Sequence, residues 1–220
     1  VQPFGDGHEV LIRTRALTAE GIRLVDGVLQ EAFGEVQNRR TEVVGPAIGQ
    51  ELVSNALWAL VLASLGILAY ISLRFEFTSG IAAIFALTHD ALITIGIFSL
   101  IGTEVNSTFV AAILTIIGYS INNTIVIFDR VRENMRNTKG KYSFAKLVNT
   151  SVWETMARSI NTSLTTLLVV VCLFLFGGST ITDFTLALII GLAAGTYSSI
   201  CVTTSFWVLW RERREKLVDV

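Results

Sequence analysis

Five apolar runs occupy most of the chain after residue 54, and each is close to the ~20 residues that cross a ~30 Å hydrocarbon core as a helix. Of the 220 residues, 52% are hydrophobic and only 16% are charged, whereas a soluble domain has about a quarter of its residues charged. We therefore expect an α-helical integral membrane bundle, with transmembrane helices at 54–73, 80–101, 107–128, 159–176 and 184–210.

The basic residues beyond position 50 all fall in alternate connections between these runs. Arg74 lies in the first connection, seven Lys and Arg lie between 129 and 158, and the rest lie at 211–220. Lys and Arg are enriched in cytoplasmic loops, so the pattern predicts a cytoplasmic loop at 129–158, a cytoplasmic tail at 211–220 and an extracytoplasmic (periplasmic) segment 1–50. Within the loop, 142–153 has the spacing of an amphipathic helix lying at the membrane interface.

Segment 1–50 is far more polar than the rest of the chain. Its pattern predicts a strand at 8–14, an amphipathic helix at 18–33 that stops at Gly34, and a second strand at 35–44. This is half of a small α+β domain and is too short to bury a core of its own. Because the chain starts at Val1 and not at Met, we expect it to be the later part of a longer protein, or a trimmed one.

Polar side chains inside three of the runs fall at helical spacing, which puts each set on one face of its helix. We expect these faces to meet in the core of the bundle. The alternative is that they only hold helices together through hydrogen bonds. The sets are Asp90 and Thr94 in the second run, Thr115, Tyr119, Asn122 and Asn123 in the third, and Arg158, Asn161, Thr162, Thr165 and Thr166 in the fourth.

Asp90 is the intramembrane residue with the strongest claim to a function. An ionised carboxylate at mid-span costs about 2.5–3.5 kcal/mol on insertion scales, so Asp90 is either protonated or paired. Arg158 either extends its charge to the interface or reaches inward to Asp90 or the asparagines. Asp129 and Arg130, at the membrane edge, are expected to mark the membrane boundary and to form ion pairs.

Two further patterns bound the function. Gly191 and Gly195 form a GxxxG pair, for which close helix packing is the expected role. The sequence contains no P-loop, no Cys/His metal pattern and no nucleophile–base signature, and its net charge of −1 does not suggest nucleic acid. We therefore expect a protein that is not an enzyme, with no metal site, no cofactor and no nucleic-acid partner.

From residue 43 to 210 the chain carries a series of motifs in a fixed order, including Val44-Gly45-Pro46, His89-Asp90, Gly118-Tyr119-Ser120-Ile121-Asn122, Asp129-Arg130-Val131-Arg132-Glu133-Asn134, Arg158-Ser159-Ile160-Asn161 and Gly177-Gly178. Together they resemble the SecF family, the smaller subunit or C-terminal half of the bacterial SecDF protein-export complex, within the resistance-nodulation-division superfamily.

The resemblance implies six membrane helices, of which this chain has five, and an extracytoplasmic ferredoxin-like domain, of which segment 1–50 is a part. It implies a location in the bacterial cytoplasmic (inner) membrane and a role in completing protein export after the ATP-driven motor step. The implied partners are SecD, the SecYEG channel with its SecA-driven translocase, unfolded preprotein and the lipid bilayer. The implied coupling ion is the proton, driven by the proton motive force.

The site residues of this chain match the family motifs at all but one of the positions compared. Gly118, Tyr119, Asp129 and Arg130 match the family motif, Arg158 matches the arginine that opens the family's fifth helix, and His89-Asp90 matches a pair in its third helix. The family's fourth helix usually reads Ile-Asn-Asp-Thr, where this chain has Ile121-Asn122-Asn123-Thr124. An amide cannot titrate. If protons pass here, the titrating group is Asp90, an aspartate on SecD, or water held by the asparagines; Asn161 and Thr165 are further candidates.

Three functions remain open on this sequence. The first is a proton-coupled accessory subunit of preprotein translocation that works with SecD. The second is a structural or assembly partner of SecD without proton coupling, marked by Asn123. The third is a fragment of a resistance-nodulation-division exporter, which is disfavoured because such exporters have much larger extracytoplasmic domains.

Overall fold

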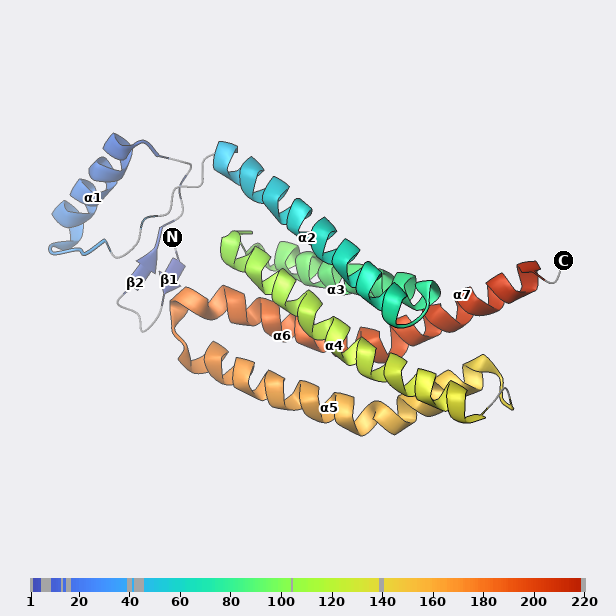
Figure 1. Ribbon diagram of the computed structural model, residues 1–220. Coiled ribbons are helices and arrows are strands. Elements are labelled where there is room, and N and C mark those ends of the chain that lie inside the picture. The colour runs from blue at the N-terminus through green and yellow to red at the C-terminus, as the bar shows by residue number, and fades with distance from the viewer. Residues whose placement is uncertain are drawn as a thin grey trace. The chain divides into compact units, whose positions relative to one another are not determined.

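The computed structural model describes residues 2–4, 9–12, 14, 17–38, 41, 46–103, 105–138 and 141–218. The chain divides into two compact units, Val1–Ala56 and Leu57–Val220. The described residues of the second unit are almost entirely helical and include most of the apolar helices; the first of these helices begins in the first unit, at Pro46 (Figure 1).

The described residues of the first unit form a short antiparallel hairpin, one complete helix and the start of the helix that begins at Pro46. Strands β1 (Gln2–Phe4) and β2 (Glu9–Leu11) pair with Pro3 opposite Val10. Helix α1 (Ala19–Phe33) starts after Thr18, whose side chain accepts a hydrogen bond from the Gly21 N–H, and stops at Gly34, where φ is +82°. A positive φ costs glycine little, which confirms the predicted helix and its stop.

The two predicted strands of this unit have different outcomes. The strand expected at 8–14 is present only as β2. The prediction of a strand at 35–44 is wrong for the described residues of that range, because residues 35–38 and 41 are not in a strand. Residues 39–40 and 42–44 lie outside the described part. A ferredoxin-like domain is not visible among the described residues.

Five helices of the described chain are long and apolar enough to cross a membrane, as the sequence predicts. They are α2 (Pro46–Arg74), α3 (Phe77–Ile101), α4 (Ser107–Thr138), α5 (Phe144–Phe176) and a last span formed by α6 (Thr182–Tyr197), the π-helix η2 (Ser198–Val202) and α7 (Thr203–Val218). A short 3₁₀ turn, η1 (Ser179–Ile181), precedes α6.

The connection predicted at 129–158 is not a loop, which corrects the sequence interpretation. Helix α4 continues to Thr138 and α5 begins at Phe144, so almost the whole segment is helical. The amphipathic pattern at 142–153 belongs to the first turns of α5 and not to a separate interfacial helix. The two helices contact each other along this stretch, where Asn134 of α4 donates to the Ser151 hydroxyl of α5 at 2.9 Å and Val131 shares a buried apolar cluster with Val148 and Val152. Ser143 caps α5 by accepting a hydrogen bond from the Lys146 N–H.

The core of the second unit includes an aromatic cluster around Trp207. The ring centroid of Trp207 lies 4.7 Å from that of Phe128 and 5.0 Å from that of Phe144. The indole N–H of Trp207 donates to the hydroxyl of Thr78, at 3.4 Å. Aromatic pairs at these distances add to the gain from burial, so the cluster joins α3, α4, α5 and α7.

The glycine pair of α6 packs closely against α4. A Cβ atom built on Gly191 would overlap the side chain of Ile116, and one on Gly195 would lie 3.1 Å from the Cβ of Ser120. Both glycines therefore let the helices approach closely, as small residues do in membrane bundles. This confirms the packing role predicted for the GxxxG pair.

Candidate functional site

Asp90 lies at the centre of a buried polar cluster formed by three helical segments. Its side chain is 0% exposed. The hydroxyls of Ser120, on α4, and Ser198, at the start of η2, each donate to its Oδ2 atom at 2.7 Å. Nδ1 of His89 lies 3.1 Å from its Oδ1 atom. In the part of the chain that the structure describes, His89 is the only basic group within ion-pair distance of Asp90.

The π-helix η2 places Ser198 against this carboxylate. In the five residues from Ser198 to Val202 the helix is widened, and the Thr203 N–H bonds to the Ser198 carbonyl five residues earlier. One turn before, Gly195 leaves room for the cluster, since a Cβ atom there would lie 3.5 Å from Oδ2 of Asp90. π-Helical turns inside α-helices occur frequently at functional sites, so this break in the last span supports Asp90 as a site residue.

The polar face predicted on α3 is confirmed. Asp90 and Thr94 are both fully buried, and the Thr94 hydroxyl donates to the Asp90 carbonyl at 2.9 Å. The α3 face therefore points into the bundle. The hydroxyl of Thr94 is satisfied within its own helix and leaves the Asp90 carboxylate to the donors from α4 and η2.

Asn123 forms a second buried cluster, which joins α4, α5 and α6. The residue is 2% exposed. Its Nδ2 atom donates to the hydroxyl of Ser163 at 3.2 Å, and the Thr196 hydroxyl donates to the same oxygen at 2.8 Å. A carboxamide donates and accepts hydrogen bonds but does not titrate in the physiological range. The cluster can thus hold the helices together, and Asn123 itself cannot carry a proton.

The polar face predicted on α5 does not lie in the core of the described bundle, where Thr162 and Thr166 are only half-buried. Arg158, Asn161 and Thr165 are exposed, and the hydroxyl of Thr165 bonds back to the Asn161 carbonyl at 2.9 Å. Asn122, on α4, is exposed as well. Of the asparagine pair, only Asn123 thus reaches the bundle interior. Asp90 is not paired with Arg158, since no ion pair joins them among the described residues.

A different set of hydroxyl side chains forms the buried face of α5, and sequence reasoning missed it. The set is Ser151, Thr155, Ser159 and Ser163. These residues recur at every fourth position, which puts them along one helix face. The regular four-residue spacing is visible in the sequence. Serine and threonine in a membrane helix are, however, weaker indicators of a buried polar face than a nearby arginine and asparagine.

Gly118 and Tyr119, the first residues of the family motif, lie at the edge of the bundle. Gly118 is exposed, and a Cβ atom built there would meet no atom within 4 Å. Tyr119 is half-buried, and its buried hydroxyl has no hydrogen-bond partner within the described residues. Packing among the described residues therefore gives no reason for a glycine at position 118.

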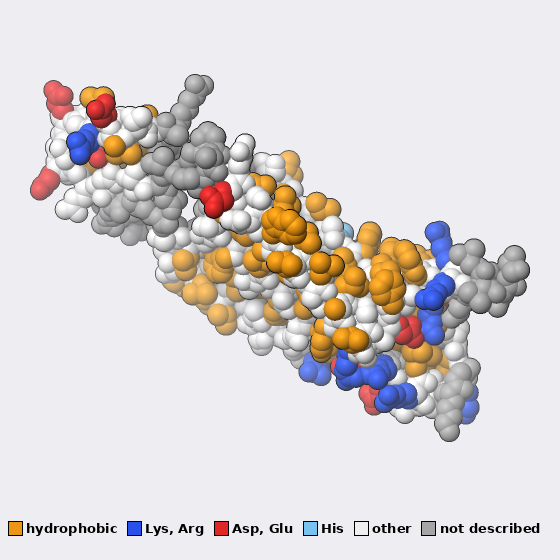
Figure 2. Space-filling view, turned by 45° about the horizontal axis from the view of Figure 1, so that its top comes forward, with side chains coloured by type: hydrophobic (Ala, Val, Ile, Leu, Met, Phe, Trp, Pro, Cys, Tyr) orange, Lys and Arg blue, Asp and Glu red, His pale blue; other side chains and the backbone are white. Residues whose placement is uncertain are grey.

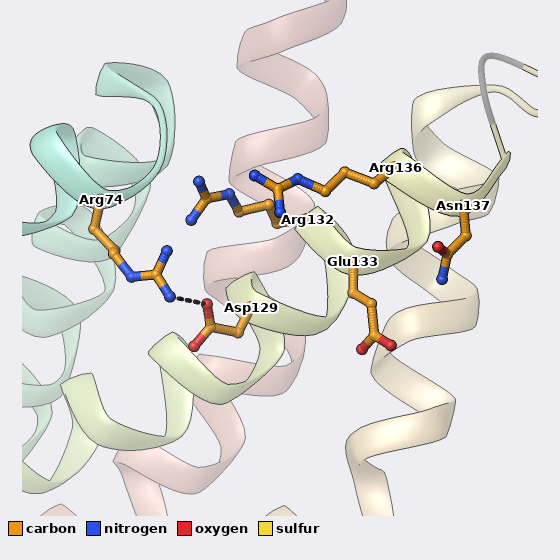
Figure 3. Close-up of a pocket in the computed structure, with 6 residues that line it drawn as sticks. All are labelled: Arg74, Asp129, Arg132, Glu133, Arg136 and Asn137. Atoms are coloured by element: carbon orange, nitrogen blue, oxygen red, sulfur yellow. Dashed lines mark ion pairs between the residues drawn. The ribbon is translucent and has the colours of Figure 1, made fainter.

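The charged end of the motif ties α4 to its neighbours. Arg130 bonds Glu154, on α5, through Nε and Glu133 through Nη1, both at 2.7 Å. The pair of Asp129 with Arg74, at 3.4 Å, links α4 to the end of α2 (Figure 3). This confirms the ion pairing predicted for both residues. Such exposed pairs contribute little to stability, and here they connect α4 to α2 and α5.

The basic residues gather at one end of the helical unit, which we term the basic end and define by Arg74, Arg130, Arg132, Arg136 and Arg211. Figure 2 shows Lys and Arg side chains concentrated at one end of the bundle and hydrophobic side chains along its length. Arg211 of α7 pairs there with Glu76 at 3.2 Å. The arrangement is typical of helices that end at a membrane surface.

Comparison with known proteins identifies one family. Residues 25–213 match the model of the family described as "Protein export membrane protein SecD/SecF, C-terminal". A protein translocase subunit SecF from Desulfurispirillum indicum is 44% identical over 97% of this chain and 71% of its own length. The SecF of Haemophilus influenzae is 41% identical over 99% of this chain and 67% of its own length.

Larger proteins that are named SecDF also match this chain. The protein translocase subunit SecDF of Bacillus subtilis is 48% identical to this chain, and the match covers 90% of this chain and 27% of the Bacillus protein. A crystal structure of SecDF from Thermus thermophilus, described as a translocon-associated membrane protein, superposes with a TM-score of 0.80 at 45% identity and covers 89% of this chain. A SecDF structure in a super-membrane-facing form gives 0.75 at 38% identity and covers 92% of the chain. In both structures the matched part is 27% of the solved chain.

Proposed function

The chain belongs to the SecD/SecF family of protein-export membrane proteins, and we propose that it serves as a SecF-type accessory subunit of Sec preprotein export in the bacterial cytoplasmic membrane. It acts with SecD after the ATP-driven step of translocation through SecYEG, uses the proton motive force, and carries out no covalent chemistry. The names of its relatives support the export role, and the residues described above support the more specific parts of the proposal.

Two exposed asparagines in the membrane helices support the proposal that SecD is the partner. Asn122 and Asn161 are exposed on α4 and α5, and within the described residues neither side chain has a hydrogen-bond partner. Asn122 is six residues, or about 9 Å, from the end of its apolar run. An unsatisfied carboxamide costs roughly 4–8 kcal/mol on a water-to-cyclohexane scale. A second membrane protein with polar groups on the facing surface removes this cost, and SecD is the partner that the SecDF relatives indicate.

The distribution of charge supports an orientation. The basic end is cytoplasmic in this proposal, because Lys and Arg are retained on that side of the membrane. The opposite ends of the helices and segment 1–50 then lie outside, where the hairpin and α1 form part of a ferredoxin-like domain that contacts unfolded preprotein.

Asp90 is the proposed proton-binding group. It is a buried carboxylate in a membrane helix, and such residues are expensive to insert and usually mark an ion or proton path. Its two serine donors come from different helical segments, so a change in its protonation would alter contacts between α3, α4 and η2. Asn123, an amide, stands where the family resemblance implies an aspartate, and Asp90 is the buried charged residue found among the described residues, so the proposal assigns proton binding to Asp90.

A structural role without proton coupling is the second candidate, and one observation favours it. The Asn123 amide donates to Ser163 and joins α4 to α5, as a group that only holds helices together would. In this case the chain still assembles with SecD, but export does not depend on protonation of Asp90.

Co-purification with SecD tests the proposed partnership. The chain and SecD are co-expressed, and the variant N122L/N161L is compared with T88L, which replaces an exposed polar residue on α3. We expect the wild type and T88L to retain SecD, and N122L/N161L to lose at least about tenfold in SecD affinity, which is about 1.4 kcal/mol. The variant should keep its thermal stability as an isolated chain, because leucine suits a lipid-exposed surface. Equal retention of SecD by all three proteins would reject this surface as the contact. Absence of SecD from the wild-type preparation would reject the proposed function.

A further inference from the structure

A pocket of about 480 Å³ opens at the basic end, between the end of α2 and the outer turns of α4 (Figure 3). The volume falls in the range of sites that bind small ligands. Neither the polar clusters around Asp90 and Asn123 nor the exposed asparagines belong to it. The residues that line it are Arg74, Asp129, Arg132, Glu133, Arg136 and Asn137.

The positive charges of this pocket are not fully balanced by its carboxylates. Asp129 pairs with Arg74 at 3.4 Å, while the Glu133 carboxylate is bound to Arg130 at 2.7 Å. Among the described residues, no ion pair is found for Arg132 or Arg136. Figure 3 shows both of their guanidinium groups extended toward the side from which Arg74 approaches, while Glu133 and Asn137 point away.

Two guanidinium groups on the same side of a helix repel each other. Arg132 and Arg136 are four residues apart on α4, a spacing at which like charges destabilise an isolated helix. Arginine stays charged at any relevant pH, so loss of a proton does not relieve this repulsion. The arrangement therefore favours a bound anion, and planar guanidinium groups match phosphate oxygens through paired hydrogen bonds.

The surroundings of the pocket are suited to a ligand with apolar chains as well as a phosphate. Leu73, directly before Arg74, is 89% exposed, and Phe77 and Tyr70 are exposed nearby on α2 and α3. The most apolar stretch of α2 has only 6% of its residues buried. Acyl chains can therefore lie along α2 while the headgroup occupies the pocket at its end. A soluble phosphate would use the guanidinium groups but not this apolar surface.

We propose that this pocket binds the phosphodiester headgroup of an anionic phospholipid, with Arg132 and Arg136 as the principal ligands and Arg74 at its edge. Basic pockets between membrane helices at the cytoplasmic surface are known to hold such headgroups. The site is independent of SecD and of proton coupling, so it goes beyond the proposed function. It would anchor the end of α4, and with it the ion pairs that connect α4 to α2 and α5.

Lipid retention by the purified full chain tests the proposal. The chain is reconstituted in nanodiscs of phosphatidylcholine with a small fraction of phosphatidylglycerol, and bound lipid is quantified by native mass spectrometry after extraction. The variant R132Q/R136Q is compared with R213Q/R214Q, which removes the same charge from exposed positions of α7 that do not line the pocket. We expect wild type and R213Q/R214Q to retain one phosphatidylglycerol, and R132Q/R136Q to bind it about 10- to 30-fold more weakly, from the loss of two basic residues.

The other outcomes overturn the proposal. Equal loss in R213Q/R214Q would mean that phosphatidylglycerol responds to the basic surface as a whole and not to a pocket. Displacement of the lipid by inorganic phosphate or glycerol phosphate at matched concentrations would make a soluble anion the ligand. If R132Q/R136Q does not fold, the single variant R136E replaces it, because Arg136 is exposed; unchanged lipid binding in R136E would also reject the site.

Discussion

The contact between Gly191 and Ile116 allows a quantitative test of how α4 and α6 pack. The change Gly191→Ala puts a methyl group into the space of the Ile116 side chain, because a Cβ atom there would overlap three of its carbons. Ile116 is 1% exposed and has little room to move. Overpacking of a core costs about 1–3 kcal/mol, so we expect Gly191→Ala to destabilise the chain by about that amount despite the better helix propensity of alanine.

The companion change Ile116→Ala opens a cavity and should cost about 2–5 kcal/mol. In the double variant the new methyl of residue 191 enters the space that Ile116 vacates. The two costs should therefore not add, and a coupling of about 1–2 kcal/mol is expected for residues in contact. Unfolding of the purified chain in mixed detergent–SDS micelles measures all three free energies.

Gly96→Ala is the matched control, because a Cβ atom at Gly96 meets nothing within 4 Å. It should be neutral, or stabilising by up to about 1 kcal/mol from helix propensity. The packing argument is refuted if Gly191→Ala is no more harmful than Gly96→Ala, or if the costs of Gly191→Ala and Ile116→Ala simply add.

Three further predictions concern single contacts. Trp207→Phe removes the hydrogen bond to Thr78 and part of the ring volume, and should lower the free energy of unfolding by about 1–3 kcal/mol; an unchanged value would exclude a structural role for the indole. Arg130→Gln removes the bond to Glu154 and should lower Tm only slightly, because the ion pair is exposed. The difference in Tm from wild type should shrink at high salt, and a salt-independent loss would contradict the ion-pair explanation. Gly118→Ala should leave the stability of the isolated chain unchanged or raised by up to about 1 kcal/mol, and a clear loss of Tm in that chain would show a contact that the described residues lack.

The number and type of the membrane helices could be predicted from sequence because length and apolarity determine them almost alone. The ends of α4 and α5 could not. Their apolar runs stop near residue 128 and start near 159, but both helices continue into the charged region, where their mutual packing replaces lipid. Hydropathy detects the bilayer boundary and not the end of a helix that protrudes from it.

Only part of the site can be predicted from sequence, because the sequence does not show which face of each helix is turned toward its neighbours. The sequence alone identifies Asp90, because a carboxylate in an apolar run is costly to insert in whichever direction the side chain points. The sequence does not identify Ser120 and Ser198 as the hydrogen-bond donors to Asp90. Serine is common in membrane helices, and these two serines lie 30 and 108 residues from Asp90 in the chain. Neighbouring residues on a helix point about 100° apart. A stripe assigned around Arg158 thus missed the buried face beside it at Ser159, because the sequence does not determine how a helix is rotated against its neighbours.

The most direct test of the central claim is preprotein release from spheroplasts under an imposed proton gradient, with SecD and either the wild-type chain, Asp90→Asn or Asn123→Asp. Asparagine keeps the size of Asp90 and can still accept from Ser120 and Ser198, but it cannot bind or release a proton. We predict gradient-dependent release with the wild type and with Asn123→Asp, and loss of that dependence with Asp90→Asn while SecD still co-purifies. Gradient-dependent release that persists in Asp90→Asn would contradict the account, and no response in the wild type with a response only in Asn123→Asp would assign proton coupling to position 123.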